Sequence, residues 1–259
     1  MAVGCRGRGS DVRQEKRCKT REGATKTMFT PDLRQISTIN AILSVFETGR
    51  IPTKEAYQTV ALLSDGAGIS YGKHQSTDRS GSLDAITQRY RDLGGRELVP
   101  FEGYLRANDS TKLNPRTPFA QQPDWYRALV AALQTAERPA HAAAQDEVFA
   151  KTYWLPALQE GQNAGCQYAL SFCMLYDTCI HSGAGKMAFH RNRFPEKAPV
   201  NGGDEKAWIT AYLKDREAWL AGSSNPLVQK TVYRPQTLRG LLENPHLQTP
   251  LVIRGVTLV

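Results

Sequence analysis

Long hydrophobic runs are missing from this sequence. Of its 259 residues 41% are hydrophobic, yet no segment approaches the roughly 18–20 consecutive apolar residues that a membrane-spanning helix needs. The N-terminus also lacks the apolar core of about 7–15 residues and the small-residue cleavage site of a secretory signal peptide. We therefore expect neither membrane insertion nor export through a standard signal peptide.

Cysteine is scarce and does not occur in a metal-binding pattern. The five cysteines are Cys5, Cys18, Cys166, Cys173 and Cys179, and they form no pair of CxxC motifs. An odd number in apolar surroundings favours reduced, buried thiols that pack as small hydrophobic side chains. The sequence predicts no metal site and no cofactor.

Acidic residues are outnumbered, but the imbalance is local. Residues 1–27 contain eight Lys and Arg against three acids, a charge of +5, so +3 of the total of +8 remains for the rest of the chain. With almost no large apolar residues, residues 1–29 are expected to form a disordered basic tail. A solvated tail, a polyanion-binding tail and a natural start at Met28 all fit this pattern. Because most of the basic excess lies in the tail, we expect no nucleic-acid partner for residues 30–259.

Helical periodicity dominates the remaining chain. The first helix is predicted from Thr30, as its N-cap, to near Gly49. Further helices are predicted over residues 53–64, 82–95, 126–136, 142–161, 164–183 and 202–222, and residues 250–259 as a terminal strand or packed tail. Residues 164–183 are apolar nearly all round, which is typical of a central buried helix. The fold class is mainly α (α+β), with a small early β-hairpin region.

The segment LLSDGAGISYGKHQSTDRSGS, residues 62–82, interrupts the helices. It has neither the GxxxxGK[ST] nor the GxGxxG pattern of phosphate-binding loops, and its Gly, Asp and Ser residues are typical of tight turns. Glu47 ends the first helix and Asp65 follows eighteen residues later in this segment. Two carboxylates on opposing elements are what glycosidic cleavage requires. The alternative is that they are an ordinary helix end and an Asx turn.

The order of several motifs supports the catalytic interpretation. FETG, DGAGIS and SLDAITQRY together resemble the start of the family 46 glycoside hydrolases, the chitosanases. Downstream, AAAQDEVFAKTYWLPAL, LSFCMLYDTCIHSGAG and DEKAWITAYLKDREAWL resemble later helices of that family, so the resemblance spans about residues 33–240. It implies a two-lobed, lysozyme-like fold with a cleft between the lobes.

The resemblance also implies a mechanism. It makes Glu47 the general acid and Asp65 the general base of an inverting hydrolysis, and Ser70 a residue that helps to hold the attacking water. Glu47 is then expected to be partly shielded from water, while Asp65 stays ionised in a wetter hairpin. A further alternative is that the fold persists as a non-catalytic glycan-binding or cell-wall-binding module.

Two positions depart from the family pattern. Ala67 replaces a usual Arg, which leaves Lys73 or Arg79 to partner Asp65, and Ser82 replaces a common acid that helps to bind the cationic sugar. Asp78 or Asp84 could compensate for Ser82. The resemblance implies internal cleavage of a β-1,4-linked amino-sugar polymer. The family favours chitosan as this polymer, whereas Ser82 and the charge of the chain favour the glycan strand of peptidoglycan.

Several other side chains have a structural and a functional interpretation. Tyr71 and His74 are candidate substrate-binding residues together with Ser82, although a core tyrosine and a turn histidine are equally ordinary. Asp177 and His181, four residues apart, are expected to form a structural pair. Arg216 is expected to pair with a buried acid.

The expected place of action is outside the cell or at the cell wall, with a monomer acting on its polysaccharide. Phage-type release, a specialised secretion system or a misplaced start would each account for the missing signal peptide. The sequence does not choose among these export routes.

Overall fold

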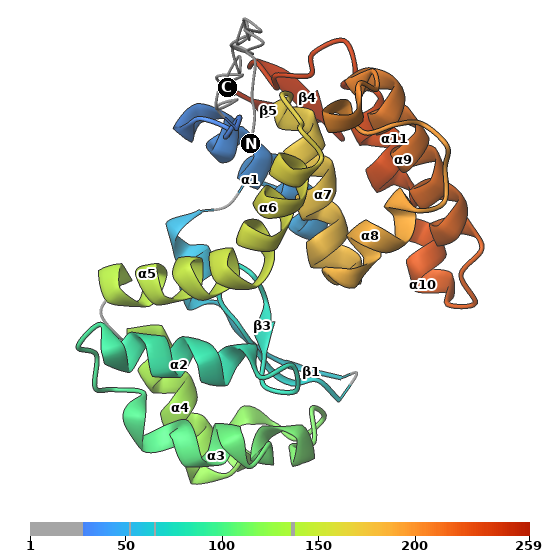
Figure 1. Ribbon diagram of the computed structural model, residues 1–259. Helices are drawn as coiled ribbons and strands as arrows, with labels where there is room; N and C mark the ends of the chain where they lie inside the picture. The colour runs from blue at the N-terminus through green and yellow to red at the C-terminus, as the bar shows by residue number, and fades with distance from the viewer. Residues whose placement is uncertain (1–27, 52, 65, 136–137) are drawn as a thin grey trace, which may run out of the picture.

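Two lobes make up the computed structural model, which describes residues 28–259 apart from 52, 65 and 136–137 (Figure 1). The predicted tail over residues 1–27 and the predicted general base Asp65 therefore lie outside the described residues. The architecture is mostly helical with a small early sheet, which confirms the predicted fold class. In the described parts of the chain, no helix combines the length and apolar character that crossing a bilayer requires.

The elements follow one another as helices around two short β regions. The helices are α1 Leu33–Thr48, α2 Ser82–Asp92, α3 Glu102–Arg106, α4 Asp124–Thr135, α5 Arg138–Phe149, α6 Leu155–Asn163, α7 Ala169–Ser182, α8 Gly185–Arg191, α9 Glu205–Ala221, α10 Pro226–Gln229 and α11 Tyr233–Arg239. The strands are β1 Val60–Leu63, β2 Gly68–Tyr71, β3 Ser76–Thr77, β4 Leu251–Ile253 and β5 Val256–Leu258.

The smaller lobe is built on the early sheet. Strands β1, β2 and β3 pair antiparallel in sequence order, with Val60 opposite Tyr71 and Ser70 opposite Thr77. Helices α2 to α5 contribute to one hydrophobic cluster with β2, in which Ile69 and Leu129 are fully buried. This cluster holds the hairpin segment in place on the small-lobe side.

The larger lobe surrounds α7. Its residues 169–179 are all buried, and α1, α6, α8, α9, α11 and the β4–β5 hairpin contribute to one cluster with it. The prediction of a central buried helix is confirmed. Cys166, Cys173 and Cys179 are buried free thiols in this lobe, as expected.

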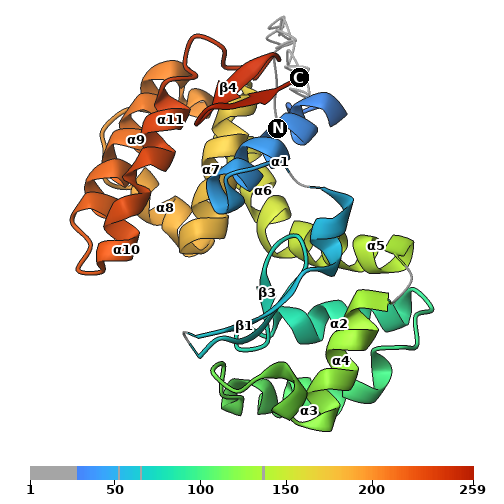
Figure 2. The same ribbon diagram turned by 180° about the vertical axis from the view of Figure 1, so that it is seen from behind.

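A long helical segment joins the lobes. Helix α5 packs in the small lobe and α6 packs on α7 in the large lobe, as both views show (Figures 1 and 2). Between them, residues Ala150–Trp154 form a turn of π-helix. Such turns are often found at functional sites, and this one lies where the two lobes meet.

Two local predictions were wrong. Helix α1 is capped by Asp32 rather than Thr30, because the Asp32 carboxylate accepts from the Gln35 backbone N–H and the Gln35 amide oxygen accepts from the Asp32 N–H. The predicted helix over residues 53–64 is a short 3-10 turn, Lys54–Gln58, followed by β1. The apolar residues 60–63 become a strand because β2 offers them backbone partners, which a short apolar run does not reveal by itself.

Two other local predictions, the end of the first helix and the C-terminal strand or packed tail, are confirmed. Helix α1 stops at Gly49, whose φ of 75° is the left-handed conformation that glycine adopts without strain. The C-terminal residues predicted as a strand or packed tail form the β4–β5 hairpin.

Candidate active site

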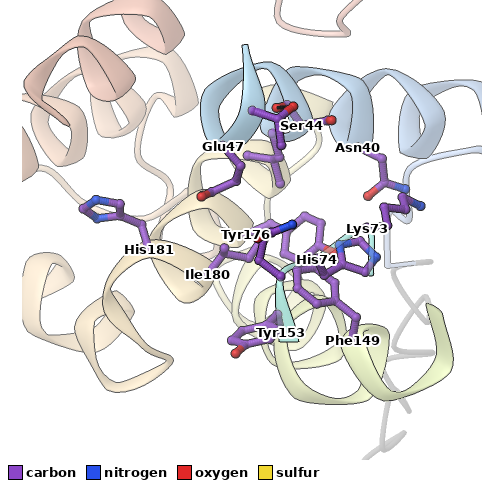
Figure 3. Close-up of a pocket in the computed structure, with 13 residues that line it drawn as sticks. Asn40, Ser44, Glu47, Lys73, His74, Phe149, Tyr153, Tyr176, Ile180 and His181 are labelled. Carbon is purple, nitrogen blue, oxygen red and sulfur yellow. Dashed lines mark hydrogen bonds between the residues drawn. The ribbon is translucent and has the colours of Figure 1, made fainter. Parts of the chain in front are cut away.

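A pocket of about 320 Å³ lies where the two lobes meet. Its walls come from α1, from the loop after β2, from the end of α5 with the π turn, and from α7 (Figure 3). The lining residues are Asn40, Leu43, Ser44, Glu47, Thr48, Lys73, His74, Gln75, Phe149, Tyr153, Tyr176, Ile180 and His181. The pocket therefore brings one acid, two histidines and several aromatic rings together from segments far apart in the sequence.

A smaller hollow of about 210 Å³ continues this pocket along α1. It shares Asn40, Lys73, His74, Phe149 and Tyr176 with the main pocket and adds Ile36, Asp146, Ala150 and Trp154. Together the two hollows form an elongated cleft.

Glu47 sits in the last turn of α1 and its side chain reaches into the pocket (Figure 3). The side chain is 45% exposed, so it is partly shielded from water. Its Oε1 accepts a hydrogen bond of 2.7 Å from Nη2 of Arg234 on α11. The acid predicted from sequence is thus placed at the cleft and held by a cation from the large lobe.

Arg234 belongs to a buried charge cluster behind Glu47. Its Nε and Nη2 donate to Oδ1 of Asp177 at 2.9 and 2.6 Å, and Arg216 donates to the other oxygen of Asp177. Burial alone would raise the pKa of Asp177, but the two guanidinium groups lower it to about 2. The prediction that Arg216 pairs with a buried acid is confirmed.

His181 does not pair with Asp177 as predicted, because the two arginines occupy both carboxylate oxygens. Its Nδ1 instead lies 3.0 Å from the Ser182 hydroxyl, and the ring lines the pocket. Burial, with the nearby Arg234 and Arg216, lowers the pKa of His181 to about 4. The ring is therefore neutral in mildly acidic solution.

Ser70 is close to the pocket but does not line it. It is 1% exposed, and its hydroxyl donates to Oε1 of Gln75 at 2.9 Å. Gln75 does line the pocket, in a left-handed backbone conformation with φ of 52°. Any influence of Ser70 on the cleft in this conformation passes through Gln75.

Tyr71 and Ser82 lie away from the pocket. Tyr71 is fully buried, with its hydroxyl 2.5 Å from Nδ1 of His141. Neighbouring residues on a strand point to opposite faces, so Tyr71 points away from the face of Ser70. Ser82 begins α2, and its hydroxyl accepts from the Thr77 N–H at 3.0 Å. The structure therefore does not bring these two candidate substrate-binding residues to the cleft.

His74, a candidate substrate-binding residue from the sequence, lines both hollows. Its ring stacks on Phe149, with centroids 3.6 Å apart, and its Nε2 lies 3.4 Å from Oδ1 of Asp146. Burial lowers the pKa of His74, an effect that Lys73 adds to and Asp146 opposes. The ring is an aromatic wall of the cleft.

Asp146 on α5 organises this side of the cleft and was missed by sequence reasoning. Lys73 lies 3.2 Å from its Oδ1, and the Tyr57 hydroxyl donates to its Oδ2 at 2.7 Å. Burial would raise the pKa of Asp146, but hydrogen bonds from His74 and Tyr57 and the charge of Lys73 lower it to about 2. The motif AAAQDEVF contains this aspartate, but only the fold reveals its partners.

Lys73 is thus engaged by Asp146 and Tyr57, with Nζ 3.0 Å from the Tyr57 hydroxyl.

Asp78, suggested as a replacement for the missing acid at position 82, is 1% exposed and hydrogen-bonded to Ser110 inside the small lobe. Asp84 accepts from Gln88 on the same helix. Neither aspartate lines the cleft hollows.

Among the described residues, no group of three or more His, Cys, Asp or Glu side chains is arranged to hold a metal ion. The chemistry that the pocket offers on these residues is acid–base chemistry, centred on Glu47.

Comparisons with known proteins identify the family of this chain. The model of "Glycosyl hydrolase family 46" matches residues 41–251, well over half of the chain. A chitosanase of Bacillus subtilis (strain 168) is 25% identical over 228 residues, covering 83% of this chain and 79% of the relative.

Solved structures with the same fold include two chitosanases. The native chitosanase from Bacillus subtilis MY002 has a TM-score of 0.71 and 23% identity, covering 88% of this chain and 99% of its own. A Gynuella sunshinyii GH46 chitosanase in complex with chitotetraose has a TM-score of 0.68 and 24% identity, covering 88% and 98%. The extent of the family match, with a fold shared along nearly the whole chain, places this protein in glycosyl hydrolase family 46, and it is a glycoside hydrolase.

Proposed function

We propose that this hydrolase is an endo-acting chitosanase that cleaves β-1,4 bonds with inversion, and that residues 30–259 act as one monomeric catalytic domain. The observation that carries the proposal is the position of Glu47, at the cleft between the lobes and hydrogen-bonded to Arg234. The relatives named above are chitosanases, and one of them was solved with chitotetraose. The elongated cleft fits an internal stretch of polymer.

In the proposed reaction Glu47 gives its proton to the oxygen of the leaving sugar. Asp65 takes a proton from a water molecule, whose oxygen attacks the anomeric carbon from the opposite side as the bond to the leaving oxygen breaks. One water is consumed and the configuration at that carbon inverts. The carboxyl groups of inverting enzymes lie roughly 6.5–9.5 Å apart, which leaves room for this water.

Arg234 supports the acid in this mechanism. When Glu47 has donated its proton it carries a negative charge, and the guanidinium at 2.7 Å stabilises that charge. Asp177 and Arg216 hold Arg234 in place from behind. On the other side of the cleft, Ser70 orients Gln75, whose amide is the group that we expect to contact the attacking water.

Two basic side chains of the cleft, Lys73 and His181, carry little uncompensated positive charge. Lys73 is neutralised by Asp146 and His181 is uncharged in mild acid, so neither repels a polycation strongly. Peptidoglycan is the second candidate, favoured by the charge of +3 that remains outside residues 1–27. Either polymer lies outside the cell membrane, and we propose that the enzyme acts there.

The test is digestion of chitosan and purified peptidoglycan side by side, with mass analysis of the products and nuclear magnetic resonance of the new reducing ends. We expect glucosamine ends from chitosan in the α configuration at the first time points, and no muramic acid ends. β-Configured initial products would contradict inversion, and cleavage of peptidoglycan alone would overturn the substrate.

Variants test the roles of the residues. Glu47→Gln and Asp65→Asn are each expected to lower kcat on chitosan at least about a thousandfold, because a general acid or base contributes about 10²–10⁴-fold and the two act together. Glu147→Gln changes an exposed acid on α5 that pairs with Arg89, and it is the control that should leave kcat unchanged. Undiminished hydrolysis by Glu47→Gln would refute the proposed mechanism.

A further inference from the structure

Two consecutive residues of α11 bind two consecutive residues of α1. Arg234 holds the Glu47 carboxylate, and the preceding Tyr233 donates its hydroxyl to the backbone oxygen of Phe46 at 2.8 Å. Both contacts join residues 187 positions apart in the sequence. The end of α1 that carries Glu47 is therefore gripped through its side chain and through its backbone.

The Phe46 carbonyl lies where a helix leaves acceptors unsatisfied. Helix α1 ends at Thr48, and the N–H of Gly49 turns back to the Val45 oxygen at 2.9 Å. The last carbonyls of a helix have no intrahelical donor and need one from elsewhere. The Tyr233 hydroxyl supplies such a donor one residue before Glu47.

Two contacts within the large lobe fix the Tyr233 ring. The ring forms a T-shaped pair with Phe46, with centroids 5.9 Å apart and planes at 76°. The guanidinium of Arg254, on the turn of the β4–β5 hairpin, lies 3.8 Å over the ring centroid. Tyr233 is absent from the lining of both cleft hollows, so it acts on the site through α1.

We propose that Tyr233 is a positioning residue for the general acid. Its hydrogen bond to Phe46 sets where the last turn of α1 ends and so where the Glu47 carboxyl meets the leaving oxygen. Small misplacements of a reacting group lower rates strongly, by up to about a hundredfold for 1 Å. This inference rests on the proposed function, in which Glu47 protonates the leaving group.

The test is Tyr233→Phe, assayed on two substrates that differ in their need for a proton. Chitohexaose has a sugar alcohol as its leaving group and requires protonation, whereas a dinitrophenyl glycoside of chitotriose releases a stable phenolate without it. We expect kcat on chitohexaose to fall about tenfold with KM within about twofold, and kcat on the dinitrophenyl substrate to stay within about twofold. An equal loss on both substrates, or no loss on chitohexaose, would overturn the proposal.

Two further variants keep the result interpretable. Tyr90→Phe removes a tyrosine hydroxyl that donates to Glu97 at 2.5 Å in the small lobe, and we expect both activities to be retained. Arg254→Asn removes the cation over the Tyr233 ring while suiting the left-handed backbone at φ 49°. Arg254→Asn should lower kcat on chitohexaose less than Tyr233→Phe does, and should leave kcat on the dinitrophenyl substrate nearly unchanged. The proposal thus stays testable if thermal melting shows that Tyr233→Phe folds poorly.

Glu47→Gln separates the two proposals. It should abolish chitohexaose cleavage and retain most activity on the dinitrophenyl substrate. Full activity of Glu47→Gln on chitohexaose would refute the proposed function and therefore also the role proposed for Tyr233. If Glu47→Gln is inactive on chitohexaose and Tyr233→Phe is fully active, the role proposed for Tyr233 is refuted and the proposed function stands.

Discussion

Nη2 of Arg234 lies 2.7 Å from Oε1 of Glu47 and 2.6 Å from Oδ1 of Asp177. One guanidinium thus links an acid that is 45% exposed at the cleft to an aspartate that is fully buried on α7. The position of the acid in the cleft and the stability of the large lobe therefore depend on the same side chain.

Asp177→Asn is expected to destabilise the protein by about 3–5 kcal/mol, because it leaves the buried guanidinium groups of Arg216 and Arg234 without their anion. Urea unfolding followed by circular dichroism measures this loss. The control is Glu147→Gln, whose ion pair with Arg89 is exposed and screened by solvent. A loss no larger than that of the control would show that the buried cluster contributes little to stability.

Stability should fall as the pH is lowered from 6.5 toward 4, in part because of His141. Burial lowers the pKa of His141 to about 4 from its usual 6.5, so the unfolded chain binds a proton in this window that the folded chain does not. His141 thus stabilises the fold fully above pH 6.5, and this contribution is lost as the pH falls to about 4. His181 has a lowered pKa of about 4 and acts in the same direction.

His141→Gln tests this prediction. Its free energy of unfolding should depend less steeply on pH between 6.5 and 4, by up to about 1.4 kcal/mol per pH unit. Above pH 7 the difference between the two proteins should be constant. Parallel curves over the whole range would contradict the expected role of His141.

Asp146→Asn should raise KM for chitosan several-fold. The substitution leaves Lys73 in the cleft without its anion at 3.2 Å, and a cation there repels the ammonium groups of the polymer. The effect should shrink as salt is added, because salt screens charges. KM is measured against the neighbouring control Glu147→Gln, and equal values at low salt would refute the role assigned to Asp146.

Gly72→Ala should destabilise the protein more than Gly94→Ala. Both glycines have left-handed backbone, with φ of 76° and 93°, so each substitution carries strain of about 1–2 kcal/mol. At Gly72 a Cβ would also overlap the Gln145 amide, whereas at Gly94 it meets open space.

The displaced Gln145 would lose its bonds to the Lys73 N–H and to the Tyr57 carbonyl, which anchor the cleft loop. Gly72→Ala should therefore also raise KM on chitosan. Urea unfolding and initial rates measure the two effects, and equal stability losses for the two glycine variants would contradict the tight contact.

The sequence predicted most helices correctly but placed one helix boundary and one strand wrongly. Periodicity located α1, α2, α4, α7 and α9, because an amphipathic or fully buried helix carries its pattern locally. It failed over residues 60–63, where the strand depends on pairing with β2. The N-cap was misplaced by two residues because Thr30 and Asp32 are both good caps, and only the bond from Gln35 distinguishes them.

Prediction of the site was limited by side-chain direction. Strand β2 is buried along its whole length, so its sequence shows no alternation between a core face and a cleft face. Ser70 and Tyr71, both candidates, point to opposite faces of that strand and could not both meet the cleft. The structure places Tyr71 in the core against His141 and connects Ser70 to the cleft through Gln75.

By itself, the sequence determined the helical pattern, the glycine-rich hairpin and the place of Glu47 at the end of the first helix, since each depends on residues close together in the chain. Tertiary structure alone decided that Arg234 reaches Glu47 and that Asp146 reaches Lys73, across 187 and 73 positions. Such pairs leave no periodic trace, because their geometry arises only when separate helices pack around a common core. The residues that hold the acid and shape the cleft were therefore found in the fold.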